Sequence, residues 1–249
     1  MRCHGHDAVM TSTALLPILQ RNLARVQQRI EHACALANRE HPPQLIAVTK
    51  YAPEPAFSAF LETGHLQLGE SRVQQLNERA EQYNSHPISW HLIGHLQRNK
   101  VRLAIEHASL IHSVDSLRLL QAIEKAAVEQ NKQIKVLLQW NISGEQSKSG
   151  LAPSEWDQVL KAVAELKRVT VEGLMTMAPY TDQQEVIRST FTGLAELKEQ
   201  LQHAVDSRHP MTELSMGMSH DLEIAIECGA TMVRIGTDLF REIPGYGKK

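Results

Sequence analysis

The sequence predicts a closed (β/α)8 barrel, also called a TIM barrel. Eight short apolar segments recur along its 249 residues, and longer amphipathic segments separate them. Strands that alternate with helices pair in parallel, because antiparallel neighbours would need only tight turns between them. Eight such units in about 200 residues suit a small closed barrel. An open doubly wound sheet is the alternative, but no G-x-G-x-x-G pattern follows the first strand to support its dinucleotide-binding form.

The first expected element is a long amphipathic helix from Thr13 to about Asn38, ended by Pro42-Pro43. Its apolar stripe consists of Leu16, Leu19, Leu23, Val26, Ile30 and Ala33. A helix that covers the barrel is the simpler interpretation, and a coiled coil is the alternative. Residues 1–11 are expected to form a disordered tail, and residues 12–249 a single domain that includes this helix. A monomer is expected, with pairing of the helix to a partner left open.

Eight predicted strands follow this helix, at residues 44–50, 65–70, 89–94, 109–114, 134–141, 169–175, 211–217 and 231–237. Helical patterns lie between them, for example at residues 55–64, 116–130 and 185–204. In a (β/α)8 barrel the loops after the strands form the functional face. The polar segment "NISGEQSKSG" follows the fifth strand, and Asn141, Ser143, Glu145 and Lys148 are expected to form a non-catalytic rim there.

Composition excludes several classes of protein. A formal net charge of −2 leaves no overall basic surface for nucleic acid. The three cysteines, Cys3, Cys34 and Cys228, are too few and too scattered for a disulfide framework, which favours the cytoplasm. The sequence begins without a secretory signal and has no apolar run long enough to cross a bilayer, so no membrane contact is expected. Cys3, His4 and His6 could bind a metal, but a polar terminus is the simpler explanation.

Chemically useful side chains collect at the ends of the predicted strands. Such residues include Lys50, Glu70, Ser71, His91, His95, Ser113, Asp115, Met175, Met177, Met216 and Met218. The spacing of His91 and His95 is that of some zinc sites, but no glutamate lies between them and packing is the better explanation. The methionines are expected to be apolar lining.

The loops after the seventh and eighth strands, "SMGMSHD" and "RIGTD", have the composition of a phosphate site. Barrels commonly bind phosphate at these two loops. Gly217 and Gly236 allow the backbone to approach an anion, Ser219 and Thr237 supply hydroxyl donors, and a helix is expected to begin near Ser219. Residues 219–221 could simply cap that helix, and the two interpretations are compatible.

Lys50 ends the first strand, which lies beside the eighth strand in a closed barrel. An amine in an apolar barrel mouth can have a lowered pKa and attack an aldehyde. A phosphate-bearing aldehyde beside a lysine indicates pyridoxal 5'-phosphate held as a Schiff base.

The sequence resembles the pyridoxal phosphate homeostasis (YggS/PROSC) family. The resemblance runs in order from about Leu45 to Phe240 and is carried by "LIAVTK", "LGESRVQQL", "WHLIGHLQRNK", "HSVDS", "QWNISGEQSKSG", "VEGLMTMAP", "LSMGMSHDLEIAI" and "VRIGTDLF". The resemblance implies a single barrel similar to the N-terminal domain of alanine racemase, of fold type III among pyridoxal phosphate proteins. It also implies the cofactor as an internal aldimine on Lys50.

The resemblance further implies a set of cofactor-binding residues. Ser219, Gly236 and Thr237, with the backbone of Met218, would hold the phosphate, and Arg234 would face the pyridine nitrogen. Ser71 and His91 complete the set of candidates. Ser71 replaces the asparagine that many members have after Gly-Glu, and Arg241 replaces the usual glycine after "IGTDLF".

Arg234 indicates little or no catalysis. A guanidinium only donates hydrogen bonds, so a pyridine nitrogen facing it stays unprotonated and is a weaker electron sink. A racemase also needs a second base, and Tyr51, Tyr83, Tyr180 and Tyr246 match no motif for that role, although His91 could stand in. The leading hypothesis is therefore a pyridoxal phosphate-binding protein of cofactor homeostasis, with cofactor-dependent apoenzymes as possible partners. The alternatives are a fold type III amino-acid racemase and a cofactor-free Schiff-base aldolase.

Overall fold

The computed structural model describes residues 11–145 and 148–247 and contains a closed barrel of eight parallel strands. The strands are β1 (Gln44–Val48), β2 (Gln67–Glu70), β3 (Ser89–Leu92), β4 (Leu110–Val114), β5 (Ile134–Gln139), β6 (Val169–Met175), β7 (Glu213–Ser215) and β8 (Met232–Ile235). Each observed strand lies inside a predicted segment. β1 pairs with β8 from Gln44↔Met232 to Ala47↔Ile235, which closes the sheet and excludes the open alternative.

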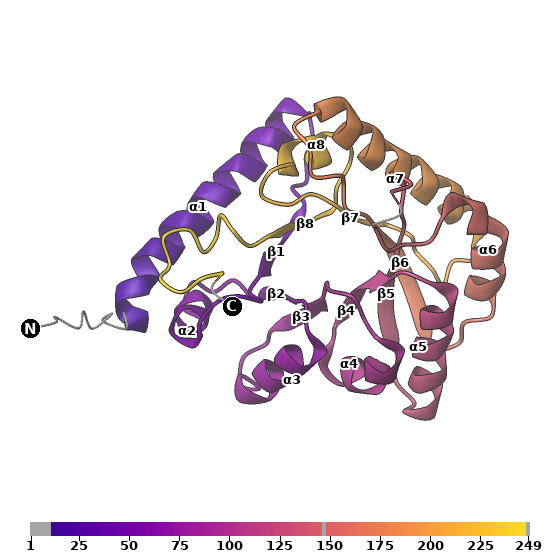
Figure 1. Cartoon of the computed structure of the whole chain (residues 1–249), viewed down its shortest axis with the longest axis horizontal. Helices are drawn as coiled ribbons and strands as arrows, with labels where there is room; N and C mark the ends of the chain where they lie inside the picture. The colour runs from indigo at the N-terminus through magenta and orange to yellow at the C-terminus, as the bar shows by residue number, and fades with distance from the viewer. Residues whose placement is uncertain (1–10, 146–147, 248–249) are drawn as a thin grey trace, which may run out of the picture.

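The helices form an outer layer around the barrel (Figure 1). They are α1 (Ser12–Leu36), α2 (Glu54–Leu61), α3 (Val73–Gln82), α4 (Val101–His107), α5 (Leu117–Glu129), α6 (Trp156–Ala164), α7 (Gln184–Ala204) and α8 (Leu222–Glu227), with short 3-10 turns η1 (Arg98–Lys100) and η2 (Pro153–Glu155). The N-terminal helix α1 packs against α2 and α8. Its stripe of Leu19, Val26, Ile30 and Ala33 is buried, which confirms the predicted cover helix.

Two apolar layers hold this arrangement together. Ile46, Leu110, Leu137, Met175 and Met232 form a small cluster of their own, with Met177 packed against it. A much larger continuous layer joins the strands to the helices. Burial of apolar side chains of this size contributes about 1.5–3 kcal/mol each.

Close packing of β6 against β7 requires a glycine at position 173. A Cβ at Gly173 would lie 1.9 Å from the carbonyl oxygen of Glu213, its partner on β7. No side chain fits at that distance, so the residue is fixed by the neighbouring backbone.

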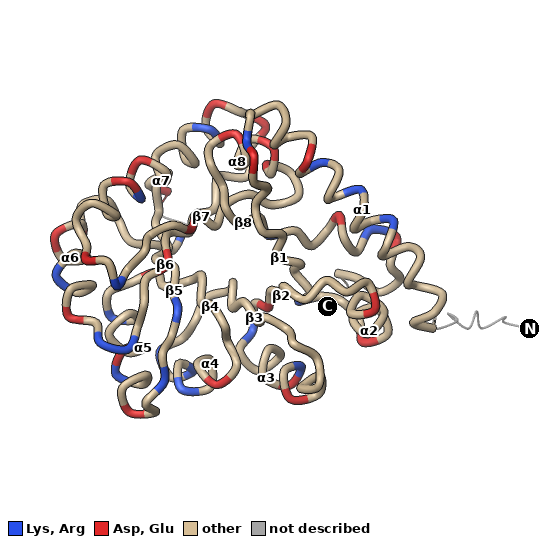
Figure 2. Tube along the Cα trace, turned by 180° about the vertical axis from the view of Figure 1, so that it is seen from behind, with Lys and Arg blue, Asp and Glu red and all other residues tan. Residues whose placement is uncertain are grey.

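Charged residues of both signs are spread around the outer helices (Figure 2). None of the helices in the described ranges combines the length and hydropathy needed to cross a bilayer. The expected tail at residues 1–11 falls, apart from Thr11, outside the described residues, and so do Cys3, His4 and His6. Cys34 and Cys228 are both free thiols.

Candidate functional site

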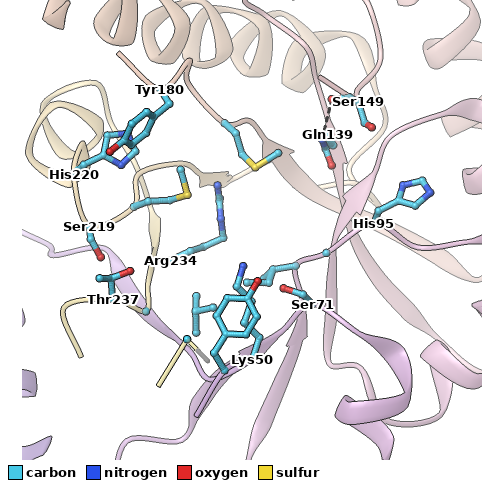
Figure 3. Close-up of a pocket in the computed structure, with 18 of the residues that line it drawn as sticks. Lys50, Ser71, His95, Gln139, Ser149, Tyr180, Ser219, His220, Arg234 and Thr237 are labelled. Carbon is cyan, nitrogen blue, oxygen red and sulfur yellow. Dashed lines mark hydrogen bonds between the residues drawn. The ribbon is translucent and has the colours of Figure 1, made fainter. Parts of the chain in front are cut away.

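A cavity of about 880 Å³ opens at the carboxyl ends of the strands. Seven of the eight predicted cofactor-binding residues line it: Lys50, Ser71, Met218, Ser219, Arg234, Gly236 and Thr237. Figure 3 shows Lys50 and Ser71 on one side, Ser219 and Thr237 on another, and Arg234 between them. Segments that are nearly 190 residues apart in sequence therefore meet in one place.

Lys50 reaches the cavity because it lies two residues beyond the end of β1. The pairing of Ala47 with Ile235 brings the chain after β1 next to the chain after β8, as predicted. Within the described ranges, the Nζ atom of Lys50 makes no hydrogen bond or ion pair, and it lies 5.0 Å from the centre of the Tyr51 ring. An amine without an internal partner is available to a ligand.

A buried ion pair supports the turn that follows Lys50. Nη1 of Arg79 lies 2.5 Å from Oε1 of Glu70, and the two side chains are 7% and 0% exposed. Arg79 also donates to the carbonyl oxygens of Thr49 (3.0 Å) and Ala52 (2.7 Å), on either side of Lys50. Burial raises the pKa of Glu70, although the charge of Arg79 opposes the shift. This pair fixes the backbone that carries the lysine.

The loop after β7 presents the hydroxyl group of Ser219 to the cavity, but not at the start of a helix. Helix α8 begins at Leu222, three residues later than predicted. The amide of Met218 donates to Oδ1 of Asp221 (2.5 Å), and the amide of Asp221 donates back to the Met218 carbonyl (3.2 Å), which closes a turn before the helix. The predicted helix start near Ser219 was therefore too early. Asp221 is the N-cap residue of α8, as the capping alternative implied, but among the described residues its side chain makes no capping hydrogen bond to the helix.

The loop after β8 supplies the second hydroxyl, that of Thr237. Among the described residues, neither Thr237 Oγ1 nor Ser219 Oγ has a hydrogen-bond partner, and Figure 3 shows the two groups close together. Gly236 lies beside them, and a Cβ there would come within 2.9 Å of the Tyr246 hydroxyl and 3.2 Å of Val48. Two free hydroxyls next to a glycine backbone provide donors for an anion.

Arg234 is buried and held by two acceptors. Nη1 donates to Ser215 Oγ (2.6 Å) and Nη2 donates to the carbonyl of Thr176 (3.0 Å). Burial lowers the pKa of Arg234 to about 10. The guanidinium is therefore still charged at neutral pH and can only donate hydrogen bonds.

His91, the eighth predicted residue, is not among the described residues that line the cavity. It is buried and belongs to a hydrogen-bonded chain behind Arg234. His91 Nε2 lies 2.9 Å from Gln67 Oε1, His91 Nδ1 lies 2.9 Å from His112 Nε2, and His112 Nδ1 lies 2.8 Å from Ser215 Oγ. Its place on β3 turns the side chain toward these partners. His95, which does line the cavity, pairs with Asp115 at 2.9 Å.

One order of donors, starting at Arg234, satisfies every contact of this chain. Because Arg234 donates to Ser215, the serine hydroxyl can give its own proton to His112 Nδ1. His112 then donates from Nε2 to His91, and His91 donates from Nε2 to Gln67. Burial lowers the pKa of His91 to about 4 and that of His112 well below its ordinary value, so both rings are neutral at pH 7.

The rim loop after β5 is folded around Asn141. Its Nδ2 donates to the carbonyls of Glu145 (2.9 Å) and Lys148 (3.1 Å), and its Oδ1 accepts from Ser143 (3.2 Å) and the amide of Gly144 (3.1 Å). Lys148 lines the cavity, and its Nζ donates to the Ala178 carbonyl (2.7 Å). Of the four predicted rim residues, Lys148 lines the cavity, whereas Asn141, Ser143 and Glu145 are not among its described lining residues.

Sequence patterns did not single out three aromatic residues that reach the cavity. Tyr51, Tyr180 and Tyr246 line it, whereas Tyr83 instead bonds Glu54. Tyr246 stacks on Phe240 with ring centres 5.0 Å apart. For Tyr246, the sequence signal was the "GYG" segment that follows the eighth strand.

Met177 and Met218 line the cavity. The described residues include no cluster of histidine, cysteine and carboxylate side chains suited to a metal.

Comparison with known proteins gives consistent results. Residues 20–244 match the family model of the alanine racemase N-terminal domain. The pyridoxal phosphate homeostasis protein of Aquifex aeolicus is 41% identical over 88% of this chain and 96% of its own length. The protein of the same name from Escherichia coli is 39% identical over 88% of this chain and 94% of its own.

Solved structures extend the comparison. PipY of Synechococcus elongatus with PLP bound is 32% identical, with a TM-score of 0.78 over 89% of this chain and 99% of PipY. Alanine racemase of Streptomyces coelicolor, 16% identical, has a TM-score of 0.73 over 90% of this chain and 58% of its own, and shares the fold. With this barrel, this cavity and these relatives, the chain belongs to the family of pyridoxal phosphate homeostasis proteins.

Proposed function

We propose that this protein binds pyridoxal 5'-phosphate in the cavity and holds it covalently through Lys50, with little or no catalysis, as part of cofactor homeostasis. One observation carries the proposal. Lys50, Ser219 and Thr237 line the same cavity, and the amine and the two hydroxyls have no hydrogen-bond partner in the part of the chain that the structure describes. The PLP-bound structure of PipY, a relative of the same fold that is matched over 99% of its length, supports the choice of ligand.

The donor set fits this cofactor. When bound, the cofactor supplies an aldehyde for attachment to an amine and a phosphate that needs several hydrogen-bond donors. Ser219 and Thr237 would donate hydroxyl protons to the phosphate, and Gly236 lines the cavity beside them, whereas the amide of Met218 already donates to Asp221 Oδ1. Lys50 Nζ would be the attachment point. Ser71 lines the same side of the cavity as Lys50 and would contact the ligand beside it.

Arg234 supports holding over catalysis. Its guanidinium stays charged at neutral pH, because burial lowers its pKa only to about 10. Two acceptors, Ser215 and Thr176, keep it in place. A ring nitrogen that faces this donor would remain unprotonated, which weakens the stabilisation of carbanions.

Borohydride trapping tests the proposal directly. The purified protein is incubated with pyridoxal 5'-phosphate, reduced with borohydride and digested, and the modified peptide is identified by mass spectrometry. We expect a pyridoxyl group on Lys50 and none in Lys50→Ala. Lys148→Ala is the matched control, because Lys148 lines the same cavity but donates to the Ala178 carbonyl. Absence of the group from Lys50 would overturn the proposal.

The catalytic claim has its own measurement. Protein loaded with cofactor is mixed with L- or D-alanine in deuterated water, and loss of the α-proton is followed by NMR. We expect negligible exchange and no inversion. Rapid exchange with inversion would instead identify an amino-acid racemase. Trapping of a carbonyl substrate on Lys50 with no cofactor bound would identify an aldolase.

We further propose that the protein is a cytoplasmic monomer and that apoenzymes dependent on the cofactor are its partners. The two described cysteines, Cys34 and Cys228, are free thiols, which suits a reducing compartment. Light scattering at increasing concentration should give the 28.0 kDa mass of one chain. Protein that carries the cofactor reversibly should activate a cofactor-free aminotransferase. The same amount of protein with its cofactor reduced irreversibly onto Lys50 should activate it more slowly.

A further inference from the structure

The N-terminal helix α1 contacts both loops that present the candidate phosphate donors. It lies outside the barrel and runs past α8 (Figure 1). Strands β7 and β8 are joined by backbone hydrogen bonds, of which the last among the described residues runs from the amide of Arg234 to the carbonyl of Gly217 (2.9 Å). Ser219 and Thr237 lie beyond that bond on their two loops, so a third element that contacts both loops can set the distance between their hydroxyls.

Arg29 of α1 provides this connection through all three of its nitrogens. Nη2 donates to the carbonyl oxygen of Ser219 (3.0 Å), in the loop after β7. Nε and Nη2 donate to the two carboxylate oxygens of Glu223 in α8, at 2.8 and 3.0 Å. Nη1 donates to Asp238 Oδ2 (2.5 Å), in the loop after β8 and adjacent to Thr237.

The surroundings of Arg29 make this more than a surface ion pair. The Arg29 side chain is 31% exposed and that of Asp238 13%, so water screens their interaction only in part. Seven residues earlier on the same helix, the buried Asn22 donates to the carbonyls of Leu239 (3.2 Å) and Arg241 (2.8 Å). The segment after β8 is therefore fixed to α1 from Asp238 to Arg241.

We propose that Arg29 is a positioning residue for phosphate recognition, which sets the separation of the Ser219 and Thr237 hydroxyls. This inference rests on the function proposed above. A planar guanidinium can bind a carboxylate bidentately and reach a third acceptor at the same time, whereas a lysine amine is a single point charge. Arg29 does not line the cavity, so it would act on the ligand through the two loops.

The test compares ligands with and without a phosphate. Dissociation constants of pyridoxal 5'-phosphate and of pyridoxal are measured by absorbance titration for the parent protein, Arg29→Met and Arg29→Lys. We expect Arg29→Met to weaken binding of the phosphorylated ligand roughly tenfold, within the usual range of coupling between sites, and to change pyridoxal binding less than twofold. Arg29→Lys should restore only part of the loss.

Arg21 provides a matched control on the same helix. Its guanidinium pairs with Glu242 at 2.7 Å, also beyond β8, but both side chains are more than half exposed and touch neither hydroxyl-bearing loop. Arg21→Met should leave both dissociation constants within twofold of the parent values. Asp238→Asn should reproduce part of the loss of affinity for the phosphorylated ligand that Arg29→Met causes. The double variant should lose less binding free energy than the sum of the two single losses.

Coupling must also act in the reverse direction, because linkage between two sites is reciprocal. Hydrogen exchange in α1 should slow when the parent protein binds the phosphorylated ligand, and slow less in Arg29→Met. If Arg29→Met loses affinity equally for pyridoxal 5'-phosphate and pyridoxal, or loses affinity for neither, the positioning role is overturned. Failure of the parent protein to carry the ligand on Lys50 would instead overturn the proposed function.

Discussion

Replacement of Arg79 by methionine should destabilise the protein strongly and in a pH-dependent way. Methionine has a similar length and keeps the apolar contacts of the stem, but it removes the cation beside Glu70. The Glu70 carboxylate is 0% exposed, and its Oε2 atom already has no hydrogen-bond partner in the described structure. The Ala52 carbonyl would also lose its donor, and the Thr49 carbonyl would keep only the amide of Ala52.

The size of the effect follows from the burial of the pair. Removal of one partner from a buried ion pair costs about 3–5 kcal/mol, because the remaining charge is left uncompensated. Chains of this size lose about 2–4 °C of melting temperature per kcal/mol, so a decrease of about 6–20 °C is expected. Binding at Lys50 should weaken as well, since the same guanidinium holds the turn on both sides of that residue.

The pH dependence separates this cause from a general packing defect. Burial raises the folded-state pKa of Glu70 above its ordinary value of 4.5, and in the variant Arg79 no longer opposes the shift. A carboxyl with a raised folded-state pKa binds its proton more tightly when folded, so stability falls as the pH rises through that window. The difference from the parent protein should therefore be largest at pH 7 to 8 and smaller near pH 5.

Urea unfolding followed by circular dichroism, repeated between pH 5 and 8, measures this difference. The double variant Arg79→Met, Glu70→Gln carries no charge at either of these two positions and should recover at least half of the loss at pH 7. A loss below about 1 kcal/mol, or one that does not change with pH, would refute the argument, since a buried unpaired carboxylate must respond to protonation.

Two further predictions concern the barrel interior. Gly173→Ala should lower the free energy of unfolding by about 3 kcal/mol or more in a urea titration, because its Cβ would lie 1.9 Å from the Glu213 carbonyl oxygen. Gly193→Ala, in helix α7, is the comparison and should cost less than Gly173→Ala, since its Cβ would lie 2.9 Å from the Cγ2 atom of a side chain, Ile142, and not against backbone, and alanine favours a helix. The His91 imidazole should remain neutral at pH 5.5 in nitrogen-15 NMR spectra, because burial lowers its pKa to about 4; a charged ring at that pH would contradict the proposed order of donors.

The sequence alone determined the barrel and much of the site. Alternating apolar and amphipathic segments are local patterns, and eight of them leave few arrangements other than a closed parallel barrel. Once the barrel is accepted, residues after the strands must share one face. This rule is why Lys50, Ser219 and Thr237 could be grouped before any contact was known.

The position of His91 could not be decided in this way. His91 faces the barrel interior, because Trp90 beside it packs on Phe57 of α2, but Ile93, two residues further along, is the residue that lines the cavity. Alternation along a strand predicts which side a residue faces and does not predict which interior layer is open to a ligand. The structure places the ring in a chain with Gln67 and His112, behind Arg234. The start of α8 was equally hard to locate, because the turn between Met218 and Asp221 has the composition of a helix cap.

Only the tertiary structure identified the residues that hold the site in shape. Arg29 is 190 residues from Ser219 and 209 from Asp238, and no local pattern marks a surface arginine of an amphipathic helix as their partner. Arg79 likewise reaches back 30 residues to Thr49. Local sequence specifies which face of an element is apolar, but the close approach of distant polar groups depends on how the packed helices and strands are placed in space.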